Sequence, residues 1–348
     1  MERIPLVVAR GTPAAVGRAI GQATASALHA WRDDVAGQLG PGLRWGDAVR
    51  ASLPYRAAAE DVIPAVVAEL DGAADGAGLP RDDLFLLACD EAWTALDTDA
   101  TLRGCTDIGA LPVATADGSL LLGHTNDLGP SFRDRLVAID RQVDGEPRIF
   151  TIGIGPLISI GLNDAGVALG GNALEPNDER VGVPRWLLVR HLLAQTTLAG
   201  ALDAAVHPAR ASAYNDVVAH REGSLLNVEA SATAAAVTDA AADDGLNVHA
   251  NHYVAAEMAG YEADPASCDG SRARHARAAV LARAARGHID RASLRGLLAD
   301  HAGEHPICRH DDHYPTVFWC VVDVTRGEVD YGLGQPCLPD GETFAFAH

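Results

Sequence analysis

Basic residues are scarce in this sequence. Lys and Arg total 27 against 47 Asp and Glu, which gives the 348-residue chain a net charge of −20. A surface this acidic repels the phosphate backbone of nucleic acids. We therefore expect no nucleic-acid partner, and we interpret the excess of carboxylates as a solvated acidic surface.

Long apolar runs are also missing. The best one, "IFTIGIGPLISIGL" (149–162), is interrupted by glycines and a proline, whereas a membrane-spanning helix needs about 20 predominantly apolar residues. The first residues, "MERIPLVVARGTPAAVGRAIGQ", carry charges and glycines where a signal peptide has a continuous apolar region. The sequence predicts a cytoplasmic protein with no membrane partner.

Cysteines are few and scattered, and none forms a C-x-x-C pair. A disulfide framework is not expected at this length and density, so most of them are interpreted as small buried hydrophobic residues. The six are Cys89, Cys105, Cys268, Cys308, Cys320 and Cys337.

Nucleotide-binding loops are absent as well. "GIGPLISIG", which starts at Gly153, has the wrong spacing for a dinucleotide loop and precedes a predicted strand instead of a helix. No Gly-Lys-Ser/Thr phosphate loop is present. We expect no cofactor.

Histidines, in contrast, gather in the C-terminal part. Imidazoles next to carboxylates suit zinc, but no H-E-x-x-H spacing appears. Structural or surface roles are the simpler interpretation and no metal site is predicted, although a zinc-dependent hydrolase stays open as an alternative. The histidines are His249 and His252, then His301, His305, His310 and His313.

Helical patterns dominate the first hundred residues. A strand is predicted over residues 4–9, followed by a helix with Thr12 as its N-cap and Pro13 at its first position. A second helical stretch is expected to be interrupted near Pro54 and Pro64. The chain, 48% hydrophobic and 21% charged, is long enough to bury a large core.

The pattern changes at Cys105 from helices to hairpins. Successive hairpins indicate an antiparallel sheet, and the helices that return later make the fold class α+β. The predicted turns are Asp117-Gly118, Asp144-Gly145, residues 163–166 and Arg326-Gly327.

A glycine directly before Cys105 gives this cysteine a chemical context. The thiol could attack the carbonyl of Gly104, move the acyl group onto sulfur and let water release the upstream chain. Cys105 would then carry a free α-amino group. Such an amine has a pKa near 8 and can activate its own thiol as a neighbouring base.

Here the sequence resembles a known family, in motifs that follow one another over most of the chain. It is similar to the acyl-coenzyme A:isopenicillin N acyltransferase family of N-terminal-nucleophile (Ntn) hydrolases, whose catalytic subunit starts at an autoproteolytic cysteine. The motifs are "RGCTDIGALPVATADGSLLLGHTND" (103–127), "GTPAAVGRAIG" (11–21), "GLNDAGVALGGNAL" (161–174), "GVPRWLLVRHLL" (182–193), "VHANHY" (248–253), "ICRH" (307–310) and "GQPC" (334–337).

The resemblance implies a four-layer αββα sandwich with antiparallel sheets. It also implies self-cleavage between Gly104 and Cys105. The helical piece 1–104 and the catalytic piece 105–348 would stay associated as one structural domain.

The resemblance further implies site residues. Cys105 would be the nucleophile, Asp127 would orient it or its amine, and Asn251 would stabilise the oxyanion. The family usually has an aromatic residue before that aspartate, where this chain has Asn126.

Four more residues fall on substrate-facing positions of the family. Asp107 stands where the fungal enzyme has a hydroxyl residue, and Thr106 precedes it. Arg309 matches an arginine of the late motif, and His313 falls near the position of a further one. These four are assigned to substrate binding.

Several alternatives stay open from the sequence. Asp127 could be a turn residue, Asn251 a strand-end cap and Arg309 an ion-pair partner. Water as acceptor would make the enzyme an amide hydrolase and an amine would make it an acyltransferase, with a small amide or an acyl-coenzyme A thioester as candidate donor. A non-catalytic binding protein on the same fold is the remaining class.

Overall fold

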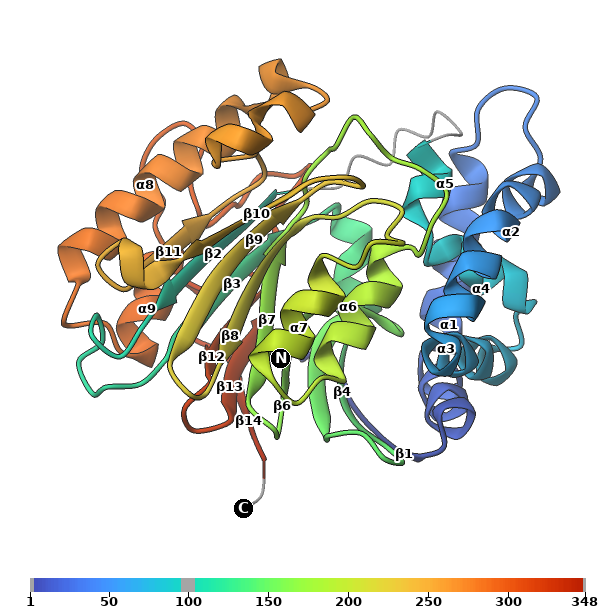
Figure 1. The fold of residues 1–348 in the computed structure, drawn as a ribbon, viewed down its shortest axis with the longest axis horizontal. Coiled ribbons are helices and arrows are strands. Elements are labelled where there is room, and N and C mark those ends of the chain that lie inside the picture. Colours follow the sequence, from blue (N-terminus) through green and yellow to red (C-terminus); the bar gives the residue numbers. More distant parts are fainter. Residues whose placement is uncertain (1–2, 95–103, 347–348) are drawn as a thin grey trace.

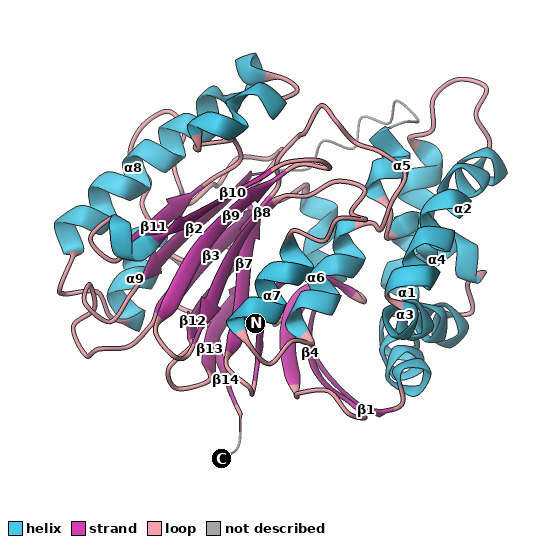
Figure 2. Cartoon of the chain, in the orientation of Figure 1, coloured by secondary structure: helices cyan, strands magenta, loops and turns pink. Residues whose placement is uncertain are grey.

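Two β-sheets packed face to face form the centre of the protein, and helices cover their outer faces (Figures 1 and 2). The computed structural model describes residues 3–94 and 104–346. Within these ranges the layers run helix, sheet, sheet, helix. The predicted four-layer α+β sandwich is therefore confirmed.

The first sheet has eight strands in the order β1-β4-β5-β6-β7-β8-β9-β10. Neighbouring strands are antiparallel except for β1, which pairs with β4 in parallel, a contact the hairpin pattern did not predict. The strands are β1 (Leu6–Gly11), β4 (Leu136–Val143), β5 (Ile149–Ile154), β6 (Leu157–Asn163), β7 (Val167–Asn172), β8 (Asn215–His220), β9 (Ser224–Ala230) and β10 (Ala235–Asp239).

The second sheet has six strands in the order β11-β2-β3-β12-β13-β14, all antiparallel. Its hairpins confirm the turns expected from the sequence, with positive φ at Gly118 and Gly327. The strands are β2 (Gly104–Ala110), β3 (Leu121–Asp127), β11 (Leu246–His249), β12 (Thr316–Asp323), β13 (Glu328–Leu333) and β14 (Glu342–Ala345).

The outer layers are helical. Buried side chains of α8 and α9 pack on the six-stranded sheet, while α1, α6 and α7 pack on the eight-stranded one. The helices are α1 (Pro13–Gly37), α2 (Trp45–Val62), α3 (Pro64–Ala77), α4 (Arg81–Leu87), α5 (Asp90–Thr94), α6 (Arg185–Leu193), α7 (Leu198–Ala205), α8 (Asp269–Ala285) and α9 (Arg291–Leu298). None of the helices within the described ranges is both long and apolar enough to cross a membrane.

Prolines and caps decide the helix boundaries in the first segment. Thr12 accepts a hydrogen bond from the backbone of Ala15 at 3.4 Å and Pro13 begins α1, as predicted. Pro64 begins α3 and so ends the preceding helix, as predicted. Pro54, however, lies inside α2, so the expected interruption there is wrong.

The N-terminal segment is tied to the rest of the fold by close packing and by buried charge. A Cβ on Gly17 of α1 would lie only 1.8 Å from the carbonyl oxygen of Glu69 on α3, so the two helices touch through their backbones. The Glu69 carboxylate forms ion pairs with Arg141 on β4 at 2.8 Å and with Arg190 on α6 at 2.7 Å. These two buried arginines hold the pKa of Glu69 below its usual value although burial opposes this.

Candidate active site around Cys105

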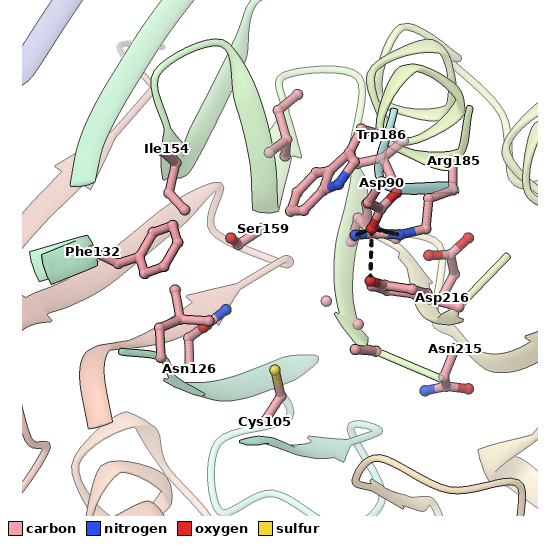
Figure 3. A pocket seen from close by; sticks show the side chains of 18 of the residues that line it. Asp90, Cys105, Asn126, Phe132, Ile154, Ser159, Arg185, Trp186, Asn215 and Asp216 are labelled. Atoms are coloured by element: carbon pink, nitrogen blue, oxygen red, sulfur yellow. Dashed lines mark hydrogen bonds and ion pairs between the residues drawn. The ribbon is translucent and has the colours of Figure 1, made fainter. Parts of the chain in front are cut away.

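Cys105 is the second residue of β2, an inner strand of the six-stranded sheet. It lies opposite Asn126 on β3, and Gly104 lies opposite Asp127. Because side chains alternate along a strand, Cys105 points into the space between the sheets, and its sulfur faces a cavity there (Figure 3). Arg103, the other flanking residue of the junction, lies outside the described residues.

The backbone nitrogen of Cys105 is held by Asn251, which follows β11. It donates a 2.8 Å hydrogen bond to Oδ1 of Asn251. The same oxygen accepts a 2.7 Å bond from Nη2 of Arg274 on α8. Because two donors converge on this end of the amide, the oxygen must face them and the NH₂ group must face away.

Asn251 is itself fixed from two further sides. Its backbone nitrogen donates to the hydroxyl of Ser271 at 2.7 Å, and its Nδ2 donates to the carbonyl of Ala173 at 3.1 Å. An amide nitrogen carries two hydrogens, so one remains for a further acceptor. The predicted oxyanion donor therefore also orients the Cys105 nitrogen, a role the sequence did not indicate.

Asp127 lies directly beneath the Gly104–Cys105 junction. Its Oδ1 accepts a 2.7 Å bond from Thr316, while its Oδ2 has no partner in the described part of the chain. A Cβ built on Gly104 would lie 2.6 Å from that Oδ2 and 3.2 Å from Nη1 of Arg309. A side chain at position 104 would therefore collide with the carboxylate.

The carboxyl and thiol groups of the site have shifted pKa values. Burial raises the pKa of Asp127 to about 6, although Arg274, Thr316 and Arg309 oppose this. Burial, followed by the nearby charges of Asp127 and Asp107, raises the pKa of the Cys105 thiol to about 12. With its nitrogen still in a peptide bond, Cys105 is a protonated thiol at neutral pH and needs a base to become a nucleophile.

Asp107 and Thr106 extend the site in opposite directions from β2. Asp107 points between the sheets, where Nδ1 of His124 lies 2.8 Å from its Oδ1. Thr106 points toward α8 and accepts a 3.4 Å bond from Nε of Arg274. Both side chains are fully buried.

The cavity beside the Cys105 sulfur is mainly apolar. The cavity and the open space in front of it together measure about 760 Å³. Aromatic side chains, among them those of Trp31, Trp93, Phe132 and Trp186, contribute to its wall. Figure 3 shows the phenyl ring of Phe132 on the side away from Trp186, with Cys105 at the bottom.

One end of this cavity is charged. Arg185 pairs with Asp90 at 3.0 Å, and its guanidinium group lies over the Tyr214 ring at 3.1 Å from the centroid. Asp216 lies next to this group (Figure 3), and burial raises its pKa to about 7 although Arg185 opposes this. The cavity thus offers an apolar volume with a polar end.

The remaining predicted residues occupy different places. Arg309 is partly buried and pairs with Asp311 at 2.8 Å, and with Asn251 and Arg274 it lines a second, polar hollow on the α8 side of β2. His313 is exposed and lines neither hollow. Its assignment to substrate binding stays a prediction.

The sequence reasoning missed Arg274. It is buried on α8 in line with Ala278 and Ala282, at spacings of four and eight residues. A charged residue within the apolar stripe of an amphipathic helix indicates a buried partner, and that signal was available in "SRARHARAAVLA" (271–282).

A helical layer on each side of two packed sheets is the fold of the Ntn hydrolases. In this chain Cys105 lies near the start of an inner strand, with Asn251 at its nitrogen. The profile of the acyl-coenzyme A:6-aminopenicillanic acid acyl-transferase family matches residues 113–337. The chain belongs to this family of acyltransferases. The match begins after Cys105, so it does not itself include the junction.

Solved structures of low sequence identity are similar as well. A mutant of conjugated bile acid hydrolase from Clostridium perfringens gives a TM-score of 0.49 at 14% identity, over 69% of this chain and 92% of that one. Penicillin V acylase from Agrobacterium tumefaciens gives 0.47 at 12% identity, over 69% and 86%. Comparison with curated proteins gives no match.

Proposed function

We propose that this chain is the precursor of an N-terminal-cysteine enzyme that cuts itself between Gly104 and Cys105. The mature enzyme then transfers or hydrolyses the acyl group of a small amide or thioester through an acyl-Cys105 intermediate. The observation that carries the proposal is the position of the cysteine. Its nitrogen is bound by Asn251 at 2.8 Å while its sulfur faces the cavity.

Self-cleavage is an N-to-S acyl shift followed by hydrolysis. The Cys105 sulfur bonds to the carbonyl carbon of Gly104, and the Gly104–Cys105 C–N bond breaks as its nitrogen takes up a proton. Water then cleaves the thioester and leaves a carboxylate on Gly104. The thiol proton ends on the released nitrogen. Asp127, whose unpartnered Oδ2 lies next to Gly104 on the α8 side of β2, is the group we assign to orient the junction, and with a pKa of about 6 this carboxylate is mostly ionised near neutral pH.

The new amine then serves as the base for acyl transfer. It stays hydrogen-bonded to Oδ1 of Asn251, takes the thiol proton and returns it to the leaving group. The second hydrogen on Nδ2 of Asn251 is the oxyanion donor. Such a donor contributes about 3 kcal/mol to lowering the barrier.

The two pieces are expected to remain one unit after cleavage. β1 is a strand of the eight-stranded sheet, and Glu69 pairs with Arg141 and Arg190 from the larger piece. Separation would leave these buried charges unpaired, which is costly. The smaller piece is thus a lasting partner of the larger one.

The acyl group is assigned to the apolar cavity between the sheets, with its free end toward Arg185 and Asp216. Arg309 and Thr106 act from the α8 side of the sheet. Arg309 lies near Gly104 and Asp127, and Thr106 accepts a hydrogen bond from Arg274. Asp107, clamped by His124, acts as a positioning residue behind Cys105. Water or an amine would react with the same acyl-Cys105 thioester, which gives hydrolysis in the first case and acyl transfer in the second.

Trapping of the intermediate tests this proposal. Purified protein is mixed with an acyl-coenzyme A thioester or an aryl amide, quenched in acid and examined by intact and peptide mass spectrometry. The mass of one acyl group on the peptide that begins at Cys105 is expected, and none in Cys105→Ser. Turnover without acylation of Cys105, or turnover by Cys105→Ala, would overturn the proposal.

A further inference from the structure

A second cluster of reactive side chains lies outside the active site. Between α9 and β12, residues 299–315 form an irregular segment, which brings His301, Cys308 and His310 together. Cys337, from the turn after β13, completes the group. The ligand atoms of the four side chains all lie within 4.8 Å of one another.

The distances within this cluster fit a tetrahedral ion. With zinc–sulfur bonds of about 2.3 Å and zinc–nitrogen bonds of about 2.05 Å, ideal tetrahedral edges are about 3.8 Å for S–S, 3.6 Å for S–N and 3.3 Å for N–N. The two Sγ atoms are 3.7 Å apart. Nε2 of His310 lies 3.5 and 3.4 Å from the sulfurs of Cys308 and Cys337, and 3.1 Å from Nε2 of His301.

We propose that His301, Cys308, His310 and Cys337 form a structural zinc site. Both thiols lose a proton to solvent when the ion binds, and the histidines bind as neutral imidazoles through Nε2. Two thiolates and two imidazoles are a typical zinc-binding set. Because protein side chains fill all four positions, the site holds the chain and leaves no coordination position for a substrate.

The cluster lies where an ion can enter from solvent and can connect two separate segments of the chain. Cys308 is fully buried, whereas the other three residues are exposed, so zinc can enter from solvent. The segment contains no regular element, and long segments of this kind need other contacts to hold them. Zinc would fasten it to the turn that carries Cys337.

Arg309 lies between two of the zinc ligands. Its Nη1 would be 3.2 Å from a Cβ on Gly104, so the ion fixes the backbone that carries this arginine to the junction. This consequence rests on the proposed function, whereas zinc binding itself does not.

Metal content of the full-length, untagged protein tests the site. About one zinc per chain is expected, together with the charge-transfer and d–d absorption of a tetrahedral two-thiolate site after cobalt substitution. Zinc should also protect the exposed Cys337 from alkylation. Cys337→Ser and His301→Ala change exposed ligands and should lose stoichiometric zinc, with circular dichroism verifying that they fold.

Matched controls come from the same segment. His305→Ala and His313→Ala remove neighbouring histidines outside the cluster and should keep about one zinc per chain. Three results would overturn the site: no zinc bound by wild type after metal titration, full binding by Cys337→Ser, or a Cys308–Cys337 disulfide in the intact mass. Zinc retained by an inactive or uncut Cys105→Ala protein would still support the zinc site. The zinc proposal and the proposed function can therefore fail independently of each other.

Discussion

The backbone nitrogen of Cys105 donates a 2.8 Å hydrogen bond to Oδ1 of Asn251, 146 residues further along the chain. In the intact chain this nitrogen is a peptide N–H, and after the proposed cleavage it would be an amine. One contact therefore serves both states. It keeps the nitrogen in place while the group attached to it changes.

Gly104→Ala is expected to slow self-cleavage by roughly 100-fold, because a displacement of about 1 Å between reacting groups can lower a rate by this factor. The added Cβ would lie 2.6 Å from Oδ2 of Asp127, so either the carboxylate or the scissile carbonyl must move. The measurement is the rate at which full-length chain disappears after translation. Gly296→Ala on α9, where a Cβ meets nothing within 4 Å, is the control, and cleavage of Gly104→Ala at the wild-type rate would contradict the steric argument.

Arg274→Met is expected to lower activity and to destabilise the protein by about 3 kcal/mol. Arg274 is the largest favourable charge acting on Asp127 and a donor to Asn251, so its loss leaves a buried carboxylate less compensated. The acidic limb of the pH–rate profile should move to higher pH because the pKa of Asp127 rises further. Arg272→Met, an exposed position on the same helix, controls for helix effects. An unmoved limb would show that Arg274 does not act on Asp127.

Asp127→Asn should change how stability depends on pH. The folded pKa of Asp127, about 6, lies above the ordinary value of 3.8, so its favourable contribution is complete below about pH 4 and is lost as the pH rises through 6. The stability of wild type relative to Asp127→Asn should fall by about 2 kcal/mol between pH 4 and pH 7.

Urea unfolding at several pH values, with Cys105→Ala in both proteins so that neither is cut, measures this difference. Burial also raises the pKa of Glu91 and of Asp216, but these groups are common to both proteins and cancel. A flat difference, or one that grows with pH, would be inconsistent with a buried, destabilised carboxylate at position 127.

The apolar cavity predicts a preference for apolar acyl groups. Within a series of linear acyl donors, kcat/KM should rise about fourfold with each buried CH₂, which corresponds to about 0.8 kcal/mol, until the cavity is filled. Phe132→Ala should move the optimum to longer chains, since this ring forms part of the wall. Val113→Ala, at an exposed site, should leave it unchanged. Indifference to chain length would place the acyl group elsewhere.

Local features of this fold could be predicted from the sequence. The cap at Thr12, the hairpin turns and the change from helices to strands near Cys105 depend on residues close together in the chain. The family resemblance added Asp127 and Asn251, which the structure places at the two sides of the Gly104–Cys105 junction.

Contacts between distant segments could not be predicted in this way. The parallel pairing of β1 with β4 and the hydrogen bond between Arg274 and Asn251 depend on how helices and sheets pack. The sequence showed the C-terminal histidines, but it could not show that His301 and His310 come together with Cys308 and Cys337. The spacing of these four residues along the chain matches no zinc motif, and only the fold brings Cys337 to the other three.

Intact mass spectrometry of the purified wild-type protein, beside Cys105→Ala, tests the central claim most directly. Two fragments are predicted in wild type, ending at Gly104 and beginning at Cys105, which co-elute in size-exclusion chromatography, and one full-length chain in the variant. Cys268→Ala, another buried cysteine, should be cut like wild type. An uncut wild-type chain that is nevertheless active would contradict the account.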